Sequence, residues 1–219
     1  MANWSAERQI ISAGFARLAA AGLVVLFAAC AAPQPRGPVL LHPVPPPPSA
    51  GDYALAQGAL VFSGRDFTVS VRPWDYRLVA GELSRAGEPS PFGESEEDTG
   101  RFFFFRVRLE NRSSRRLVFN PLYAALLRER GAPIASLENS DLLAFADEGI
   151  AAAEARSRAF RRLSFDGAAT VRPGETLERY LVFPAPEEAP KTLTLFLDEL
   201  WWGATSFGPK FLFETYPGK

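Results

Sequence analysis

The stretch RFFFFRVRLEN at residues 101–111 decides the fold class of this chain. Arginine and glutamate side chains alternate with apolar ones along it, which predicts a β-strand with one face in a core and one toward solvent. Phe102 and Phe104 interrupt the polar face, so we expect another segment to cover that end of the strand. The apolar face is formed by Phe103, Phe105, Val107 and Leu109.

The same two-residue period recurs on both sides of this stretch. Prolines and the Pro173-Gly174 pair stand between the periodic segments and predict strand ends and turns. We therefore expect a mainly all-β domain at residues 53–219, a β-sandwich of about seven to nine strands. The further strands are expected within residues 66–74, 115–133, 169–186, 191–200 and 209–216.

One alanine-rich segment, residues 139–162, departs from this period. Asn139 or Ser140 can cap a helix, and apolar residues follow at helical spacing, so we expect one inserted helix, broken at Gly149. An irregular loop is the alternative interpretation. The residues at helical spacing are Leu143, Ala146, Ile150 and Ala153.

The order of these signals resembles a bacterial family of exported immunoglobulin-like β-sandwich domains, often lipoproteins, whose function is largely unassigned. The resemblance covers roughly the last 120 residues of the chain. It implies a fold and export from the cytoplasm, but no particular reaction. An aromatic strand, an Asn-headed turn, a charged hairpin, a Pro-Gly-Glu turn and closing aromatic strands carry it. The matching stretches are FFRVRLENRSS from 104, LLRERG from 126, RPGETLERYLVFP from 172, TLTLFL from 192 and FLFETY from 211.

Residues 1–29 have the pattern of an export signal. Basic residues precede an uninterrupted apolar run, Leu18 to Ala29, which is short for a permanent membrane span. The end of that run, LFAAC, resembles the lipobox of bacterial lipoproteins, which implies acylation of Cys30 and cleavage before it. An ordinary secretory signal with an incidental cysteine is the alternative.

Residues 31–52 contain eight prolines. Such a tract is extended at about 3.1 Å per residue, so we expect residues 30–52 to form a lipidated cysteine and a semi-stiff tether. A PxxP ligand for a recognition domain is the alternative reading of the same residues.

Composition excludes several classes of function. The 24 basic and 25 acidic residues give a net charge of −1, which argues against nucleic-acid binding. With one cysteine and one histidine, His42, the chain cannot build a disulfide framework, a cysteine-rich or histidine-based metal site, or a Ser-His-Asp triad in the domain. We therefore expect no catalytic residues, no metal, no cofactor and no small-molecule substrate.

The tryptophan pair Trp201 and Trp202 is the best candidate for a contact surface. Two consecutive tryptophans leaving a strand cannot easily both enter one core, so one should face outward. The neighbouring acids Asp198 and Glu199 allow an alternative, an envelope hydrolase with paired carboxylates beside aromatic rings.

Two charged clusters each have a structural interpretation and, as the alternative, a binding interpretation. The acidic cluster at residues 88–98 fits a solvated charge run, and alternatively a Ca²⁺ site in an adhesion module. The basic cluster at the helix end complements the helix dipole, and alternatively contacts anionic lipid. Their members are Glu88, Glu94, Glu96, Glu97 and Asp98, and Arg156, Arg158, Arg161 and Arg162.

Together these observations predict a lipid-anchored protein of the bacterial envelope, in the outer membrane and facing the periplasm. Its role is expected to be binding, assembly or scaffolding, with an envelope protein as partner.

Overall fold

The computed structural model describes residues 39–92, 100–143, 150–186 and 188–217. These residues form fourteen strands in three antiparallel sheets, together with three α-helices and one 3₁₀ turn. The predicted all-β sandwich is confirmed. The described residues hold more strands than the seven to nine expected, because several predicted long strands are interrupted and because short strands precede residue 66.

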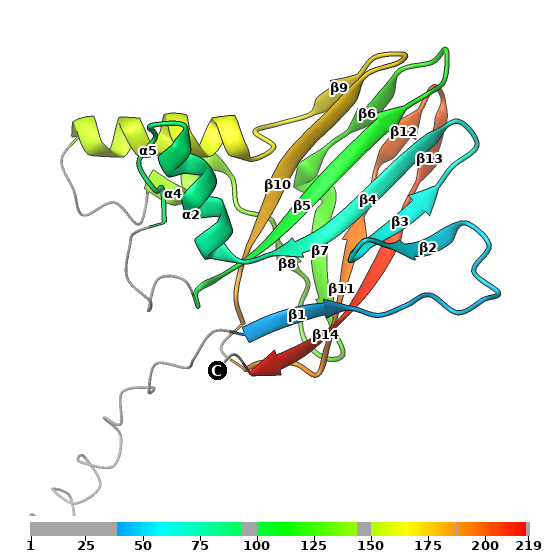
Figure 1. Ribbon diagram of the computed structural model, residues 1–219, viewed down its shortest axis with the longest axis horizontal. Coiled ribbons are helices and arrows are strands. Elements are labelled where there is room, and N and C mark those ends of the chain that lie inside the picture. Colours follow the sequence, from blue (N-terminus) through cyan, green and yellow to red (C-terminus); the bar gives the residue numbers. More distant parts are fainter. Residues whose placement is uncertain (1–38, 93–99, 144–149, 187, 218–219) are drawn as a thin grey trace, which may run out of the picture. The chain divides into compact units, whose positions relative to one another are not determined.

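One layer is a five-stranded sheet with β5 near its centre (Figure 1). Strand β5 pairs antiparallel with β10 along one edge and with β4 along the other. The strand order is β10 (Thr176–Pro184), β5 (Phe102–Asn111), β4 (Phe67–Trp74), β3 (Ala59–Ser63) and β2 (Tyr53–Ala56).

The opposite layer consists of two sheets whose strands follow one another in the chain. Three strands of the one sheet are continued by strands of the other across short breaks, at the 3₁₀ turn Pro121–Tyr123, at residues 198–199 and at residues 208–209. The first sheet has the order β1 (Val39–Pro43), β14 (Lys210–Pro217), β11 (Thr192–Leu197), β7 (Ala124–Arg128) and β8 (Ile134–Ala135). The second has the order β13 (Thr205–Phe207), β12 (Leu200–Trp202), β6 (Leu117–Phe119) and β9 (Ala169–Val171).

The two layers enclose the main core. Phe105 on β5 is fully buried, and its ring centroid lies 5.1 Å from that of Phe213 on β14 and 5.8 Å from that of Phe183 on β10. Strands β4, β5 and β10 thus face β7, β11 and β14. This is the arrangement of the A, B, E and C, F, G strands of an immunoglobulin-like sandwich.

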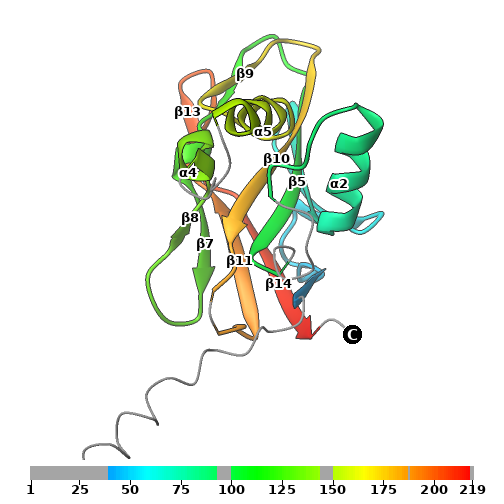
Figure 2. The ribbon, with the colours of Figure 1, turned by 90° about the vertical axis from the view of Figure 1, so that its left-hand side faces the viewer.

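Helices cover one end of the outer face of β5 (Figure 2). As predicted, Phe104 is buried there, and its ring centroid lies 5.0 Å from Phe92 and 5.7 Å from Tyr76. This second cluster includes Phe160 of the inserted helix. The helices are α2 (Tyr76–Arg85), α4 (Asn139–Leu143) and α5 (Ile150–Leu163).

Helices α4 and α5 confirm the predicted helical insertion, and its predicted break at Gly149 lies outside the described residues. Helix α2 was not predicted, although its sequence carries the signals of a helix. Asp75 caps it by accepting a hydrogen bond from the N–H of Arg77 at 2.7 Å, and Tyr76, Val79 and Leu83 are buried at helical spacing.

The end of α2 is a Schellman motif. The N–H of Glu88 donates to the carbonyl of Leu83 and the N–H of Gly87 donates to that of Ser84, both at 3.0 Å. Gly87 has a φ of 71°, a conformation that costs glycine least. The strand expected to close at Pro73 is thus followed at once by a helix that packs back on the sheet.

Strand β1 lies within the segment that was predicted to be a tether. Residues 30–52 were expected to form a lipidated cysteine and a tether with almost no hydrogen-bonded structure, but Val39–Pro43 pair antiparallel with β14, from Val39 opposite Pro217 to Pro43 opposite Phe213. Proline is tolerated here because β1 is an edge strand. The folded domain therefore begins inside the proline-rich tract.

The Asn-headed turn after β5 is a buried hydrogen-bond network. The Nδ2 of Asn111 donates to the carbonyls of Arg115 at 2.7 Å and Val171 at 2.9 Å, and its Oδ1 accepts from the Oγ of Ser113 at 2.7 Å. Asn111 thereby joins β5 to β9 of the opposite layer. Its side chain is 1% exposed, so water cannot replace these partners.

Replacing Asn111 by Ala should lower the free energy of unfolding by about 3 kcal/mol, because two buried carbonyls lose their donor. Urea unfolding followed by tryptophan fluorescence measures this difference. The neighbouring exposed variant Arg112→Ala should change it by less than about 0.5 kcal/mol. Equal stability of Asn111→Ala and the native protein would contradict a structural role for the network.

Candidate functional site

The structure separates the two tryptophans of the predicted contact surface. Trp202 points inward: its Nε1 donates to the Oγ of Ser113 at 2.8 Å, its ring lies 6.3 Å from that of Phe67, and the guanidinium of Arg115 lies 4.8 Å over it. Trp201 points outward and is 38% exposed. Trp202 thus supports the fold and is partly buried, and Trp201 is the more exposed of the two.

The alternative carboxylate pair lies at the break between β11 and β12. The Oδ1 of Asp198 accepts a hydrogen bond from the main-chain N–H of Glu199 at 2.9 Å, and Glu199 has a φ of 54°. The Asp198 side chain therefore stabilises an unusual main-chain conformation of its neighbour. This local bond accounts for an acid at that position.

Several predicted residues of the N-terminus and the acidic cluster lie outside the described residues: Cys30, Glu94, Glu96, Glu97 and Asp98. Within the described ranges, no helix is both long and apolar enough to cross a membrane. The same ranges hold no cluster of three or more His, Cys, Asp or Glu side chains placed to bind a metal ion.

The basic cluster at the end of α5 is partly neutralised within the protein. Arg162 forms an ion pair with Glu88, and the Nε of Arg161 lies 3.3 Å from the Oδ2 of Asp166. Glu88, predicted as part of the acidic cluster, therefore lies against the basic one. Arg161 and Arg162 therefore have acidic partners within the described residues.

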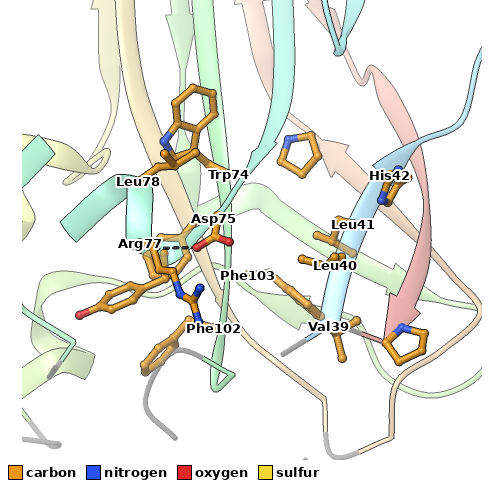
Figure 3. Close-up of a pocket in the computed structure, with 14 residues that line it drawn as sticks. Val39, Leu40, Leu41, His42, Trp74, Asp75, Arg77, Leu78, Phe102 and Phe103 are labelled. Carbon is orange, nitrogen blue, oxygen red and sulfur yellow. Dashed lines mark hydrogen bonds between the residues drawn. The ribbon is translucent and has the colours of Figure 1, made fainter. Parts of the chain in front are cut away.

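A cavity of about 680 Å³ opens between edge strand β1 and the corner where β4 runs into α2 (Figure 3). Figure 3 shows Val39, Leu40 and Leu41 on one side, with Asp75 and Arg77 across from them. The remaining lining residues are His42, Pro73, Trp74, Tyr76, Leu78, Phe102, Phe103, Phe104 and Pro217. Aromatic and aliphatic side chains dominate this wall, which is typical of a binding site.

Sequence reasoning missed this cavity for two identifiable reasons. Its first wall, β1, lies in a tract interpreted as tether, and its second wall includes α2, which was not predicted. The signals were present in the sequence: VLLH interrupts the prolines with an apolar run, and Asp75 precedes the helical spacing of Tyr76, Val79 and Leu83. The juxtaposition of the two walls has no such local signal.

An arginine clamp beside the cavity fixes α2 on the sheet. Arg106 of β5 donates from Nε to Glu178 of β10 at 2.7 Å, and its Nη1 lies 3.5 Å from Glu82 of α2. The hydroxyl of Tyr180 donates to the same Glu82 at 2.7 Å. The guanidinium of Arg106 also lies 4.8 Å over the ring of Trp74, which lines the cavity.

The clamp changes the acidity of its members. Burial, followed by the hydrogen bond to Glu82, raises the pKa of the Tyr180 hydroxyl. Partial burial lowers the pKa of the Arg106 guanidinium, but the hydrogen bond to Glu178 and the neighbouring acidic groups raise it more, so the net direction is upward. Both groups therefore keep their protons at neutral pH and act as donors.

No protein-family model matches the chain, and no curated protein matches it in sequence. Among solved structures, the crystal structure of the yjhA protein from Bacillus subtilis is similar at 10% identity with a TM-score of 0.35. That match covers 63% of this chain and 76% of the other. We therefore derive a function from the residues of this chain.

Replacing Trp202 by Ala should lower the free energy of unfolding by about 3 kcal/mol, because a packed ring and a hydrogen bond are lost. The matched variant Trp201→Ala should change it by less than about 0.5 kcal/mol, because that ring is more exposed. Chemical denaturation of both variants measures the difference. Equal losses would contradict the inward and outward assignment.

Proposed function

We propose that this protein is a lipid-anchored, non-catalytic binding protein of the bacterial envelope, held in the outer membrane and facing the periplasm. The sequence supports the anchor: an apolar run ends at Cys30, the single cysteine of the chain, in a stretch that resembles a lipobox. Acyl chains on this cysteine would contribute about 0.8 kcal/mol per buried CH₂ group, enough for durable attachment.

The cavity between β1 and α2 is the observation that carries the binding role. Its volume of about 680 Å³ lies within the roughly 300 to 1,000 Å³ of sites that bind small molecules or side chains. Trp74 and Phe102 line it and are partly exposed, and aromatic residues are enriched where proteins bind one another. Binding there would remove this apolar surface from water.

The polar groups of the cavity favour binding over catalysis. Among the described residues that line it, Asp75 is the single carboxylate, whereas hydrolysis with paired acids needs two. The Oδ1 of Asp75 already caps α2. The ring of His42 packs edge-on against Tyr216 at 4.9 Å, which is a packing contact rather than the arrangement of a general base.

The position of β1 in the sequence links the two halves of the proposal. Val39, which lines the cavity, follows Cys30 by nine positions. Acylation of Cys30 would confine the domain to a membrane surface, so its partner would be a second component of the same envelope. This geometry suits a protein that assembles or scaffolds others.

The anchor is tested by replacing Cys30 with Ala in the full chain expressed in a bacterial host. The native chain should incorporate labelled palmitate and sediment with membranes after an alkaline wash, because its acyl chains are inserted in the bilayer. Cys30→Ala should lose the label and remain in the supernatant. Label incorporation and fractionation by centrifugation measure both effects.

Ser49→Ala, in the same tract, serves as the matched control and should behave like the native chain. Membrane retention of a correctly cleaved Cys30→Ala protein would overturn the anchor. Retention without cleavage is distinguished by the mass of the product, because the signal adds 29 residues.

A further inference from the structure

We infer that the free edge of β1 and the adjacent cavity bind an extended peptide segment of a partner, which joins the first sheet as an added strand. This inference names the partner class for the cavity and rests on the binding role proposed for it. Main-chain hydrogen bonds would give the affinity, and the cavity would select the side chains.

The hydrogen-bond register of β1 shows which main-chain groups are available. The N–H of Val44 donates to the carbonyl of Leu212 at 2.9 Å, so residues 40, 42 and 44 direct their N–H and C=O groups toward β14. Val39, Leu41 and Pro43 direct theirs away from it. No described residue pairs with these outward groups, which amount to two N–H donors and three carbonyl acceptors.

One edge of the other layer, formed by β10, is protected. At the outer edge of β10, the N–H of Leu137 donates to Val182 at 2.7 Å and the N–H of Phe165 donates to Tyr180 at 3.1 Å. Such covering prevents unspecific strand pairing. The edge of β1 has no such cover among the described residues and borders the cavity along Val39, Leu40, Leu41 and His42.

The facing wall defines the chemistry of the peptide. Leu78 of α2 is 52% exposed and, with Trp74 and Phe102, lies across the cavity from β1. A strand added to β1 would place every second side chain toward this wall. The peptide should therefore carry apolar residues at alternate positions, over a paired length limited by Pro43 at one end, because proline has no N–H.

The test starts from random heptapeptides displayed on phage and selected on the full chain in detergent micelles. The best sequence is made as a synthetic, fluorescent peptide, and its dissociation constant is measured by anisotropy. N-methyl groups are then placed on alternate residues in two complementary peptides. One of the two should lose binding and the other keep it, because only one edge of an added strand faces β1.

Protein variants locate the added strand. Leu41→Pro removes an outward N–H without removing a bond to β14, and should weaken binding about tenfold more than Leu41→Ala, which loses the same packing. Leu78→Glu should abolish binding by placing a charge in the apolar wall. Leu122→Glu, on an equally exposed leucine outside the cavity lining, is the control and should leave binding unchanged.

The alternatives give different results. Failure to select any peptide overturns the inference, as does binding that is insensitive to N-methylation and to Leu41→Pro. If Leu78→Glu abolishes that insensitive binding, the cavity keeps its proposed binding role without strand addition. If the full chain instead forms a dimer that Leu41→Pro dissociates, the edge serves a second copy and the inferred partner peptide is wrong.

Discussion

The burial of strand β5 on both of its faces is the constraint on which the rest of this structure depends. Phe103 and Phe105 enter the core between the two layers, whereas Phe104 is buried on the opposite face. Burying each aromatic ring contributes about 2 to 3 kcal/mol, so neither face can remain in water without a large loss of stability. A two-layer sandwich alone covers only the first face. Helices α2 and α5 cover the second face, so the domain is a β-sandwich with helices packed on one outer face.

On each face of the same strand, a polar side chain follows the last apolar one. On the outer face, Arg106 lies where helical cover gives way to solvent, and its bonds to Glu82 and Glu178 hold α2 against the sheet. On the inner face, Asn111 ends the apolar series and satisfies the main chain of the turn and of β9. Each polar residue stands where the apolar pattern stops, and each fixes a neighbouring element in place.

The cavity is a consequence of this arrangement. Strand β4 leaves the sheet at Trp74 and turns at once into α2, while β1 adds to the edge of the other layer. The gap between them leaves Phe102 at the start of β5 and Trp74 at the corner partly exposed. Exposed apolar surface beside a free strand edge is costly for a monomer, and its retention is understandable if a partner covers it.

The sequence by itself determined most of the strands from residue 66 onward, the inserted helix, the turns and the need for cover over Phe104, because each of these is encoded in the spacing of neighbouring residues. It also indicated that Trp201 and Trp202 separate, but the hydrogen bond to Ser113 decided which one points inward. The helical spacing that begins at Tyr76 is also present in the sequence, but helix α2 was not predicted from it. Only the tertiary structure decided that Val39–Pro43 pair with the last strand and face α2, because that pairing joins residues 170 to 178 positions apart and leaves no periodic signal between them.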